Sequence, residues 1–396
     1  IMINKPSIYL DHAAGTPTSN EVLDLMLPYF GSDYGNPSAL YSLGRKAKYV
    51  LEKSRSAVAS VLHALPEEII FTGSGTESNN LALLGTARAN KIHGNHILVS
   101  AIEHKAILEA TQQLTKEGFI IEHVPVDAFG MIDINDCIGR VNEKTILISV
   151  MYANNEIGTI QPIKELSRAL SIKRKDGVYP IFHTDACQAA GYLSLNVKDL
   201  GVDLLSLNGS KIYGPKGVGV LYRKKSVATQ AIIFGGGQEE GLRSGTESLP
   251  HIVGFQEALS RVERKKEKEV VRMVTLRDEC FKSLRDALPF LVLNGHPKER
   301  LPNNIHISIP DIEGESMVLM LDALGIAVAT GSACSARDLK VSHVLQAINQ
   351  DPLLMHGSLR ITLGETTTKK ECDYFVKALF TVVEKLRTMS PLPLSL

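Results

Sequence analysis

The sequence lacks any apolar run that approaches the ~18 to 20 residues needed to span a membrane. Residues 1–15 are strand-like and include an acidic residue, which is unlike a signal peptide. The sequence also lacks an excess of either charge, because 43 basic residues balance 43 acidic residues. These absences predict a cytoplasmic protein that binds neither a membrane nor nucleic acid, and they favour a small polar substrate.

Cysteine is scarce, and no Cys-x-x-Cys pair is present. The five cysteines favour neither a disulfide framework nor a thiolate zinc site, so we expect no metal. Those that look like inert core residues are Cys137, Cys187, Cys280 and Cys372. Cys334 differs because its neighbours in Gly331-Ser332-Ala333-Cys334-Ser335-Ala336-Arg337 are too small and polar to pack a core, and a thiol in such a segment can be exposed.

Length and patterning predict two domains. The 396 residues exceed the ~250 to 300 at which single cores stop growing. From residue 68 to residue 221, short β-branched runs alternate with amphipathic stretches, which is typical of parallel β-α-β units. We therefore expect a large α/β domain over residues 15–260 and a small α+β domain formed by residues 1–14 and 261–396.

The expected strands of the large domain are residues 68–71, 96–99, 145–150, 180–183, 203–207 and 217–221. Its expected helices are residues 76–89, 105–116 and a segment after Pro162, and a long helix over residues 249–288 leads out of it. The small domain is expected to contain strands at residues 304–309 and 358–363 and helices at residues 315–324 and 369–388. Ligands of parallel sheets collect at the carboxyl ends of the strands, so polar residues there are the first candidates for a site.

A lysine stands at one such strand end. Residues 203–207 run into Asn208-Gly209-Ser210-Lys211, and a glycine-studded segment follows. A lysine held beside tight turns can be kept from water, and desolvation lowers the pKa of an amine, as a Schiff-base amine requires. Taken alone, the segment is also compatible with a surface turn that carries two ordinary lysines.

Two neighbouring strand ends carry further polar side chains. Asp185 follows the strand at residues 180–183, and its carboxylate can keep a pyridine nitrogen protonated. Gln188, three residues later, can bind a ring hydroxyl. His104 follows the strand at residues 96–99 and can lie flat on a cofactor ring or act as an acid-base group, although a histidine in this place is more often a helix cap.

Two polar loops contain the remaining candidate residues for a ligand-binding site. The turn Thr72-Gly73-Ser74-Gly75-Thr76-Glu77-Ser78-Asn79-Asn80 opens a helix, where N–H groups and hydroxyls can converge on a phosphate. It is neither a dinucleotide-binding fingerprint nor a P-loop, and an ordinary N-cap is an equally good interpretation. Asn155, in the loop over residues 151–159, can hydrogen-bond a ring or a substrate.

In this order, the segments resemble the NifS/IscS group of cysteine desulfurases, in the class V branch of fold-type I pyridoxal-phosphate enzymes. The resemblance covers nearly the whole chain. The segments that carry it are residues 9–14, 35–38, 71–81, 103–105, 154–158, 183–186, 211–219, 235–239, 243–246, 331–334 and 358–360. It implies an α/β, fold-type I transferase whose mainly parallel, seven-stranded sheet is flanked by helices, with a smaller α+β domain that carries the Cys334 loop and Arg360.

The resemblance also implies the cofactor, pyridoxal 5'-phosphate (PLP), and a role for each candidate. Lys211 is the Schiff-base lysine, Asp185 the partner of the ring nitrogen and His104 the stacking group. Cofactor contacts are implied for Gly75, Thr76, His104, Asn155, Asp185, Gln188, Asn208, Ser210, Lys211 and Thr246, with Thr246 reaching in from the second subunit of a homodimer. Asn36, Asn155 and Arg360 are implied to hold the substrate, and a planar guanidinium suits a carboxylate.

The implied reaction removes sulfur from L-cysteine, leaves L-alanine and stores the sulfur as a persulfide on Cys334. Lys211, His104 and Cys334 are the implied catalytic residues. The sulfur would pass to an acceptor protein, either an iron-sulfur scaffold or a thiolation relay. One alternative is a selenocysteine lyase or another class V enzyme that acts on a small amino acid. The other is a non-catalytic sulfur-relay or scaffold-binding protein, which requires a missing catalytic group, whereas all of them are present.

The sequence departs from the family pattern next to the lysine. Ser210 stands where the family usually has histidine, and Asn208 stands where serine is usual. Both side chains can still donate to a phosphate, but one potential positive charge is lost. We therefore expect somewhat weaker retention of the cofactor.

Overall fold

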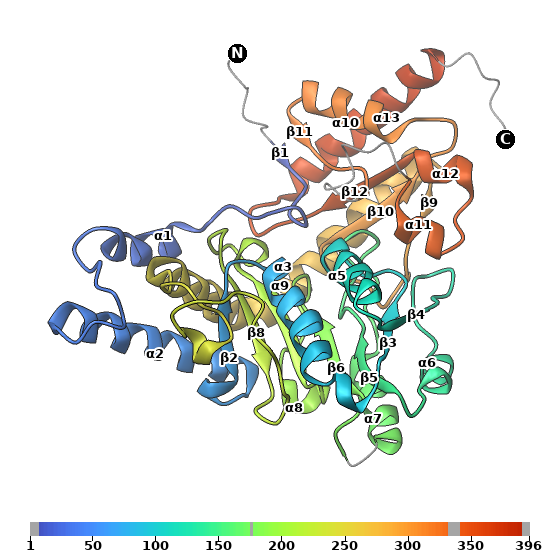
Figure 1. Cartoon of the computed structure of the whole chain (residues 1–396). Coiled ribbons are helices and arrows are strands. Elements are labelled where there is room, and N and C mark those ends of the chain that lie inside the picture. Colours follow the sequence, from blue (N-terminus) through green and yellow to red (C-terminus); the bar gives the residue numbers. More distant parts are fainter. Residues whose placement is uncertain (1–7, 175–176, 332–340, 390–396) are drawn as a thin grey trace.

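The computed structural model describes residues 8–174, 177–331 and 341–389 (Figure 1). A seven-stranded sheet forms the centre of the molecule, with strand order β2-β8-β7-β6-β5-β3-β4. Its strands are β2 (Ile69–Thr72), β3 (His96–Ser100), β4 (Ile120–Val124), β5 (Thr145–Ser149), β6 (Ile181–Asp185), β7 (Leu204–Asn208) and β8 (Gly219–Arg223). The sheet and its flanking helices confirm the expected α/β architecture.

The sheet is mainly parallel, as expected, and one strand runs antiparallel to its neighbours. β8 pairs antiparallel with both β2 and β7, whereas the other neighbours pair in parallel. Only residues 209–218 connect β7 to β8, which is fewer than the dozen or so residues that a parallel crossover usually takes. The chain therefore turns back on itself directly after Lys211.

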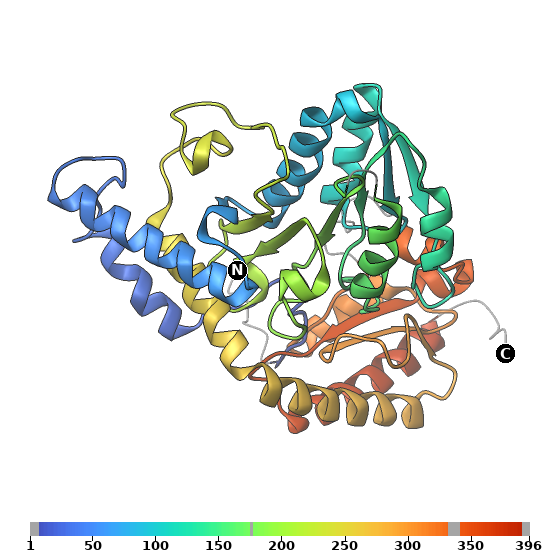
Figure 2. The ribbon, with the colours of Figure 1, turned by 90° about the horizontal axis from the view of Figure 1, so that it is seen from below.

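Helices cover the sheet, so its inner strands are buried along their whole length (Figure 2). The helices up to residue 200 are α1 (Asn20–Met26), α2 (Ser42–Leu62), α3 (Gly75–Asn80), α4 (Thr86–Ala89), α5 (Lys105–Lys116), α6 (Ile134–Arg140), α7 (Ile163–Lys173) and α8 (Val197–Leu200). The helix expected over residues 76–89 is interrupted by a π-helical turn at Leu81–Gly85. Within the described residues, no helix combines the length and the apolar character needed to cross a bilayer.

The rest of the chain forms two small sheets with helices around them. β12 (Ser358–Thr362), β10 (Asn304–Ser308) and β9 (Val292–Leu293) form an antiparallel sheet, and β1 (Ile8–Tyr9) pairs in parallel with β11 (Ile326–Ala327). The helices here are α10 (Gly314–Ala323), α11 (His343–Ala347), α12 (Pro352–His356) and α13 (Lys369–Met389). The 39-residue helix α9 (Leu249–Ala287) connects this part to the large sheet.

The buried apolar residues separate into different cores. The core on one face of the large sheet extends along α9 as far as Val262. The core of the small sheets begins on α9 at Met273 and includes Ile8 of the first strand and Leu10, which follows it. From this separation we propose a division near residue 260, with the first residues belonging to the small domain.

Three buried histidines make the fold sensitive to acid. Burial lowers the pKa of His12 and His183 to about 4 and that of His306 to about 3. Below pH ~6.5 the unfolded chain therefore binds more protons than the folded one, so stability that is present above pH ~6.5 is lost as the pH falls toward 4.

At pH 5 we expect each of these histidines to lower the free energy of unfolding by about 2 kcal/mol relative to pH 7. Urea unfolding at both pH values measures the loss. A His183→Gln variant, which keeps a polar side chain between Ser149 and Ser206, should lose less stability than the wild type on acidification. An equal loss in both proteins would contradict this account.

Candidate active site

A pocket lies at the carboxyl ends of the central strands, where parallel sheets gather ligands. It gathers residues from strand ends and loops that are far apart in the sequence. Of the residues expected at the site, it brings together Gly75, Thr76, His104, Asn155, Asp185, Gln188, Asn208, Lys211 and Arg360.

Lys211 reaches the pocket from a 3₁₀ turn, Gly209–Lys211, directly after β7. The turn is tight: a Cβ at Gly209 would lie 2.5 Å from the carbonyl oxygen of Pro215, so only glycine fits there. The Nζ of Lys211 donates a hydrogen bond to the carbonyl oxygen of Ala14, at 2.6 Å. The amine is thereby held at the wall of the pocket by the chain's first segment.

Asp185 ends β6 and is buried, with 5% of its surface exposed. Its Oδ1 accepts the N–H of Cys187 at 2.9 Å, and its Oδ2 accepts a hydrogen bond from Nδ2 of Asn79 at 2.6 Å. These two bonds fix the carboxylate while it faces the pocket. Sequence reasoning missed Asn79 as a pocket residue, although it lies in the polar turn that was singled out.

Cys187 also lines the pocket and is only partly buried, so its expected place in the core was wrong. Burial, and next the negative charge of Asp185, raise the pKa of its thiol well above the usual value. The thiol therefore stays protonated, and its chemistry remains that of an inert cysteine.

His104 both caps a helix and lines the pocket, which are the two roles that its position in the sequence suggested. Its Nδ1 accepts the N–H of Ala106 at 3.1 Å and caps α5, and its ring lines the pocket. Burial lowers the pKa of the ring, against an opposing effect of Asp185. Because Nδ1 accepts, the neutral ring carries its proton on Nε2.

The turn before α3 approaches the end of β7 closely. A Cβ at Gly75, the first residue of α3, would lie 2.8 Å from Sγ of Cys187 and 3.1 Å from Nδ2 of Asn208, so a larger residue would force these side chains to move. Gly75 and Thr76 thus face Asn208 across one corner of the pocket. N–H and side-chain donors at such a corner suit a phosphate.

Arg360 comes from β12 and is 2% exposed. Its Nη1 donates to the carbonyl oxygen of Asn155 at 3.1 Å, and its Nη2 donates to Oδ1 of Asp11 at 2.8 Å. The guanidinium therefore enters the pocket from the small domain, on the wall formed with Asn155 and the chain's first segment.

Four of the expected residues are not placed in this pocket. Asn36 is exposed in the loop before α2, where its Oδ1 accepts the N–H of Ser38 at 2.9 Å. Ser210 lies beside the pocket and donates to Oδ1 of Asn208 at 3.1 Å. Thr246 is exposed just before α9. Cys334 lies outside the described residues, so its role and those of the other three stay predictions.

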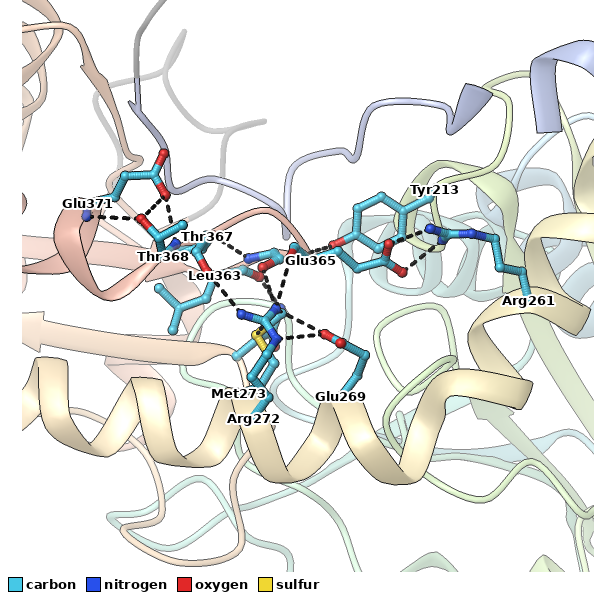
Figure 3. Close-up of polar contacts among 12 residues, drawn as sticks. Tyr213, Arg261, Glu269, Arg272, Met273, Leu363, Glu365, Thr367, Thr368 and Glu371 are labelled. Carbon is cyan, nitrogen blue, oxygen red and sulfur yellow. Dashed lines mark hydrogen bonds and ion pairs between the residues drawn. The ribbon is translucent and has the colours of Figure 1, made fainter. Parts of the chain in front are cut away.

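A polar junction connects the strand of Arg360 to helix α9 (Figure 3). Arg261 donates two hydrogen bonds to the carboxylate of Glu365, from Nη1 to Oε1 at 2.8 Å and from Nη2 to Oε2 at 2.6 Å. Arg272 donates to the carbonyl oxygens of Gly364, Glu365 and Thr367. Both arginines belong to α9, so the turn that follows β12 is fixed to that helix.

The same turn also contacts the segment of the lysine. The N–H of Glu365 donates to Oη of Tyr213 at 2.7 Å (Figure 3). Tyr213 comes two residues after Lys211, and Glu365 comes five residues after Arg360. This bond therefore joins the segments that carry the amine and the guanidinium.

Comparisons with known proteins agree with this geometry. The family described as aminotransferase class V matches residues 8–375. A protein of Dictyoglomus turgidum named cysteine desulfurase IscS is 46% identical over 387 residues, which cover 98% of this chain and 97% of that protein. A solved structure titled NifS-like protein superimposes with a TM-score of 0.89 at 35% identity, covering 96% of this chain and 100% of the other.

A further solved structure, titled SspA in complex with cysteine, has a TM-score of 0.76 at 30% identity and covers 90% of this chain and 99% of the other. The chain therefore belongs to the class V aminotransferase family and, within it, to the cysteine desulfurases. It is a PLP-dependent enzyme, as expected from the sequence.

The residues present fit that cofactor. The pocket offers an amine from Lys211, a buried carboxylate from Asp185 and a neutral imidazole from His104. Gly75 leaves a space that any larger residue would fill, next to the donors of Thr76. When bound, PLP withdraws electrons from the carbon that carries the substrate's amine.

Proposed function

We propose that this chain takes sulfur from L-cysteine, releases L-alanine and stores the sulfur as a persulfide on Cys334. The observation that carries the proposal is that Lys211, Asp185 and Arg360 line one pocket. An amine, a buried carboxylate and a guanidinium are what a PLP enzyme needs to bind its cofactor and an amino acid. The names of its relatives and the cysteine complex of a similar structure support the same substrate.

Each pocket residue has a separate task in this proposal. Lys211 attaches the cofactor and later takes the proton from the substrate's Cα. Asp185 keeps the proton on the ring nitrogen, because Asn79 and the N–H of Cys187 hold its carboxylate in place. Arg360 binds the substrate carboxylate as a fork.

The remaining pocket residues bind and orient. His104 would lie against the cofactor, and its neutral ring offers Nε2–H as a donor. Gly75, Thr76, Asn208 and Ser210 bind the phosphate, while Gln188 and Asn155 contact the ring hydroxyl. Asn155 also faces the substrate, together with Asn36.

Cys334 acts as the nucleophile toward sulfur. Its thiolate attacks the sulfur of the substrate, so an S–S bond forms as the C–S bond breaks, and the electron pair left on carbon is protonated to give alanine. Ser342, which follows the segment of Cys334, donates to Glu156 beside Asn155 at 2.5 Å. His343 contacts the carbonyl oxygen of Glu103 beside His104 at 2.9 Å. These contacts support delivery of Cys334 near the pocket.

We further propose a homodimer, a cytoplasmic location and a sulfur-acceptor protein, either an iron-sulfur scaffold or a thiolation relay. Large apolar side chains are exposed along α1, α2 and the loop between them, which supports a covered surface there. They are Leu23, Leu25, Leu27, Phe30, Tyr34, Leu40, Tyr41 and Tyr49. Thr246 is exposed on its own chain, as a residue contributed to the partner's pocket must be. Analytical ultracentrifugation tests the assembly.

The reaction is tested by supplying L-cysteine, L-selenocysteine or L-alanine as the sole substrate together with a thiol reductant, which releases sulfide from the persulfide. Alanine, sulfide and selenide are measured for the first two substrates, and consumption of alanine for the third. Release of alanine and sulfide from cysteine supports the proposal. Turnover of selenocysteine alone would establish the selenocysteine lyase instead. Turnover of none would favour a protein that retained the fold and lost the reaction.

The substitution beside Lys211 gives a prediction about cofactor affinity. Ser210 donates to Asn208 and is neutral, so the phosphate corner lacks the charge that a histidine can supply there. A Ser210→His variant is expected to bind PLP about tenfold more tightly, the effect of one favourable charge contact of about 1.4 kcal/mol. Fluorescence titration of the cofactor-free protein measures it. Equal affinity in the two proteins would count against the effect.

The junction of Figure 3 gives a second prediction. Tyr213→Phe keeps the ring and removes the acceptor of the Glu365 N–H. Loss of this buried hydrogen bond, worth about 1 kcal/mol, is expected to loosen Arg360 relative to Lys211 and to raise the KM for L-cysteine about fivefold. Steady-state kinetics and Tm are measured together. A lower Tm with unchanged KM would show that the bond serves only the fold.

A further inference from the structure

Arg360 already holds a carboxylate in this structure. Its Nη2 donates to Oδ1 of Asp11 at 2.8 Å, while its Nη1 donates to a carbonyl oxygen. Its Nε is buried and has no hydrogen-bond partner among the described residues. Before any substrate binds, the guanidinium is therefore paired with the side chain of Asp11, and its Nε donates to none of the described residues.

Asp11 is fixed at this position by the strand that carries Arg360. It forms a bridge with Thr362 of β12, whose N–H donates to the carbonyl oxygen of Leu10 at 2.8 Å and whose Oγ1 accepts the N–H of Ala13 at 2.9 Å. On its other side, Oη of Tyr9 donates to the carbonyl oxygen of Asp11 at 3.0 Å. The carboxylate thus has a set position and is not a chance contact of a free side chain.

The segment that follows Asp11 belongs to the pocket itself. The carbonyl oxygen of Ala13 accepts a hydrogen bond from Gln188 at 3.0 Å, and that of Ala14 accepts one from Lys211 at 2.6 Å. Asp11 stands just before this lining segment, and its side chain contacts the pocket through the guanidinium of Arg360.

The charges around Arg360 leave Asp11 as its counterion in the described part of the chain. His306 lies opposite Arg360 in the pairing of β10 with β12, and burial keeps it neutral. A substrate carboxylate that binds Arg360 must share one positive charge with a resident negative charge a few ångströms away. Like charges at such distances repel by more than the ~1.4 kcal/mol that corresponds to a tenfold change in affinity.

We propose that Asp11 is a specificity-determining residue that limits how tightly the pocket holds an amino-acid carboxylate. This inference rests on the proposed function, in which Arg360 binds that carboxylate. Asp11 orients the guanidinium through the Nη2 bond and at the same time weakens its attraction for the incoming anion. Both substrate capture and release of alanine then depend on one acidic side chain.

Two substitutions separate orientation from charge. Asp11→Asn keeps an oxygen that can accept from Nη2 and removes the charge. Asp11→Ala removes both. The probe is propionate, a carboxylate without an amine, and its Kd for the PLP-loaded enzyme is measured by calorimetry, independently of turnover. Asp11→Asn is expected to bind propionate about tenfold more tightly and to lower the KM for L-cysteine. Asp11→Ala should gain less, because its guanidinium is no longer oriented.

Asp278→Asn serves as the matched control, since it removes the same charge from an exposed residue of α9. Its propionate affinity should equal that of the wild type. Unchanged or weaker propionate binding by Asp11→Asn would overturn the inference, as would an equal gain in the Asp278 control.

An Arg360→Lys variant tests separately whether Arg360 binds the carboxylate, which the role of Asp11 presupposes. It should weaken propionate binding both in the wild type and in the protein that already carries Asp11→Asn. If it does not, Arg360 is not the carboxylate site and the proposed function loses that assignment. If it does, while Asp11→Asn has no effect, only the role of Asp11 fails.

Discussion

Lys211→Ala is expected to abolish turnover of L-cysteine, with a loss of about 10⁴-fold or more, because the same amine attaches the cofactor and moves the substrate proton. Among the residues that line the described pocket, Lys211 is the one with an amine. The variant should also lose the visible absorbance of the cofactor. Assays of alanine formation and absorbance spectra measure both effects.

Lys216→Ala is the control for this experiment. Lys216 lies five residues further along the same glycine-rich segment and is exposed to solvent. Its replacement should leave absorbance and turnover at wild-type levels. If the two variants behaved alike, the amine at residue 211 would have no special role.

Cys334→Ala is expected to bind L-cysteine and change the absorbance of the cofactor, yet to release no alanine in bulk. The first steps need only Lys211, Asp185 and Arg360, whereas cleavage of the C–S bond needs the thiolate. Full sulfide production by this variant would contradict the assignment of Cys334.

Cys137→Ala is the control for this experiment, because the thiol of Cys137 is not expected to react. Cys137 is buried in α6, and burial raises the pKa of its thiol to about 12. The thiol is therefore protonated at neutral pH, and its loss should leave alanine formation intact. Mass spectrometry of the wild type after addition of cysteine should show an added sulfur atom on Cys334 and none on Cys137.

Much of the fold could be predicted because the central strands have a strong local pattern. β3, β5 and β6 are short and buried at every position, and each contains a run of apolar residues. β4 was missed because it is an edge strand in which Glu122 and His123 interrupt the apolar residues and only Val124 is buried. The direction of β8 was missed because β-branched runs indicate strands but not how they pair.

From the sequence pattern alone, the candidate site could be predicted only for the residues that directly follow strands. Asp185, His104 and Lys211 stand at strand ends, where parallel sheets gather ligands. The contact between Asp11 and Arg360 joins residues 349 positions apart, and no local pattern indicates such a pair. Asn36 and Thr246 are exposed on this chain, and no local pattern indicates that such residues belong to a pocket.

The amine of Lys211 and the carboxylate of Asp185 are proposed to serve one bound cofactor. Borohydride reduction of the PLP-loaded enzyme, followed by peptide mass spectrometry, tests this proposal most directly. We predict a phosphopyridoxyl label on the peptide that contains Lys211, lost in Lys211→Ala and kept in Lys216→Ala. A label on another lysine, or none, would contradict the account.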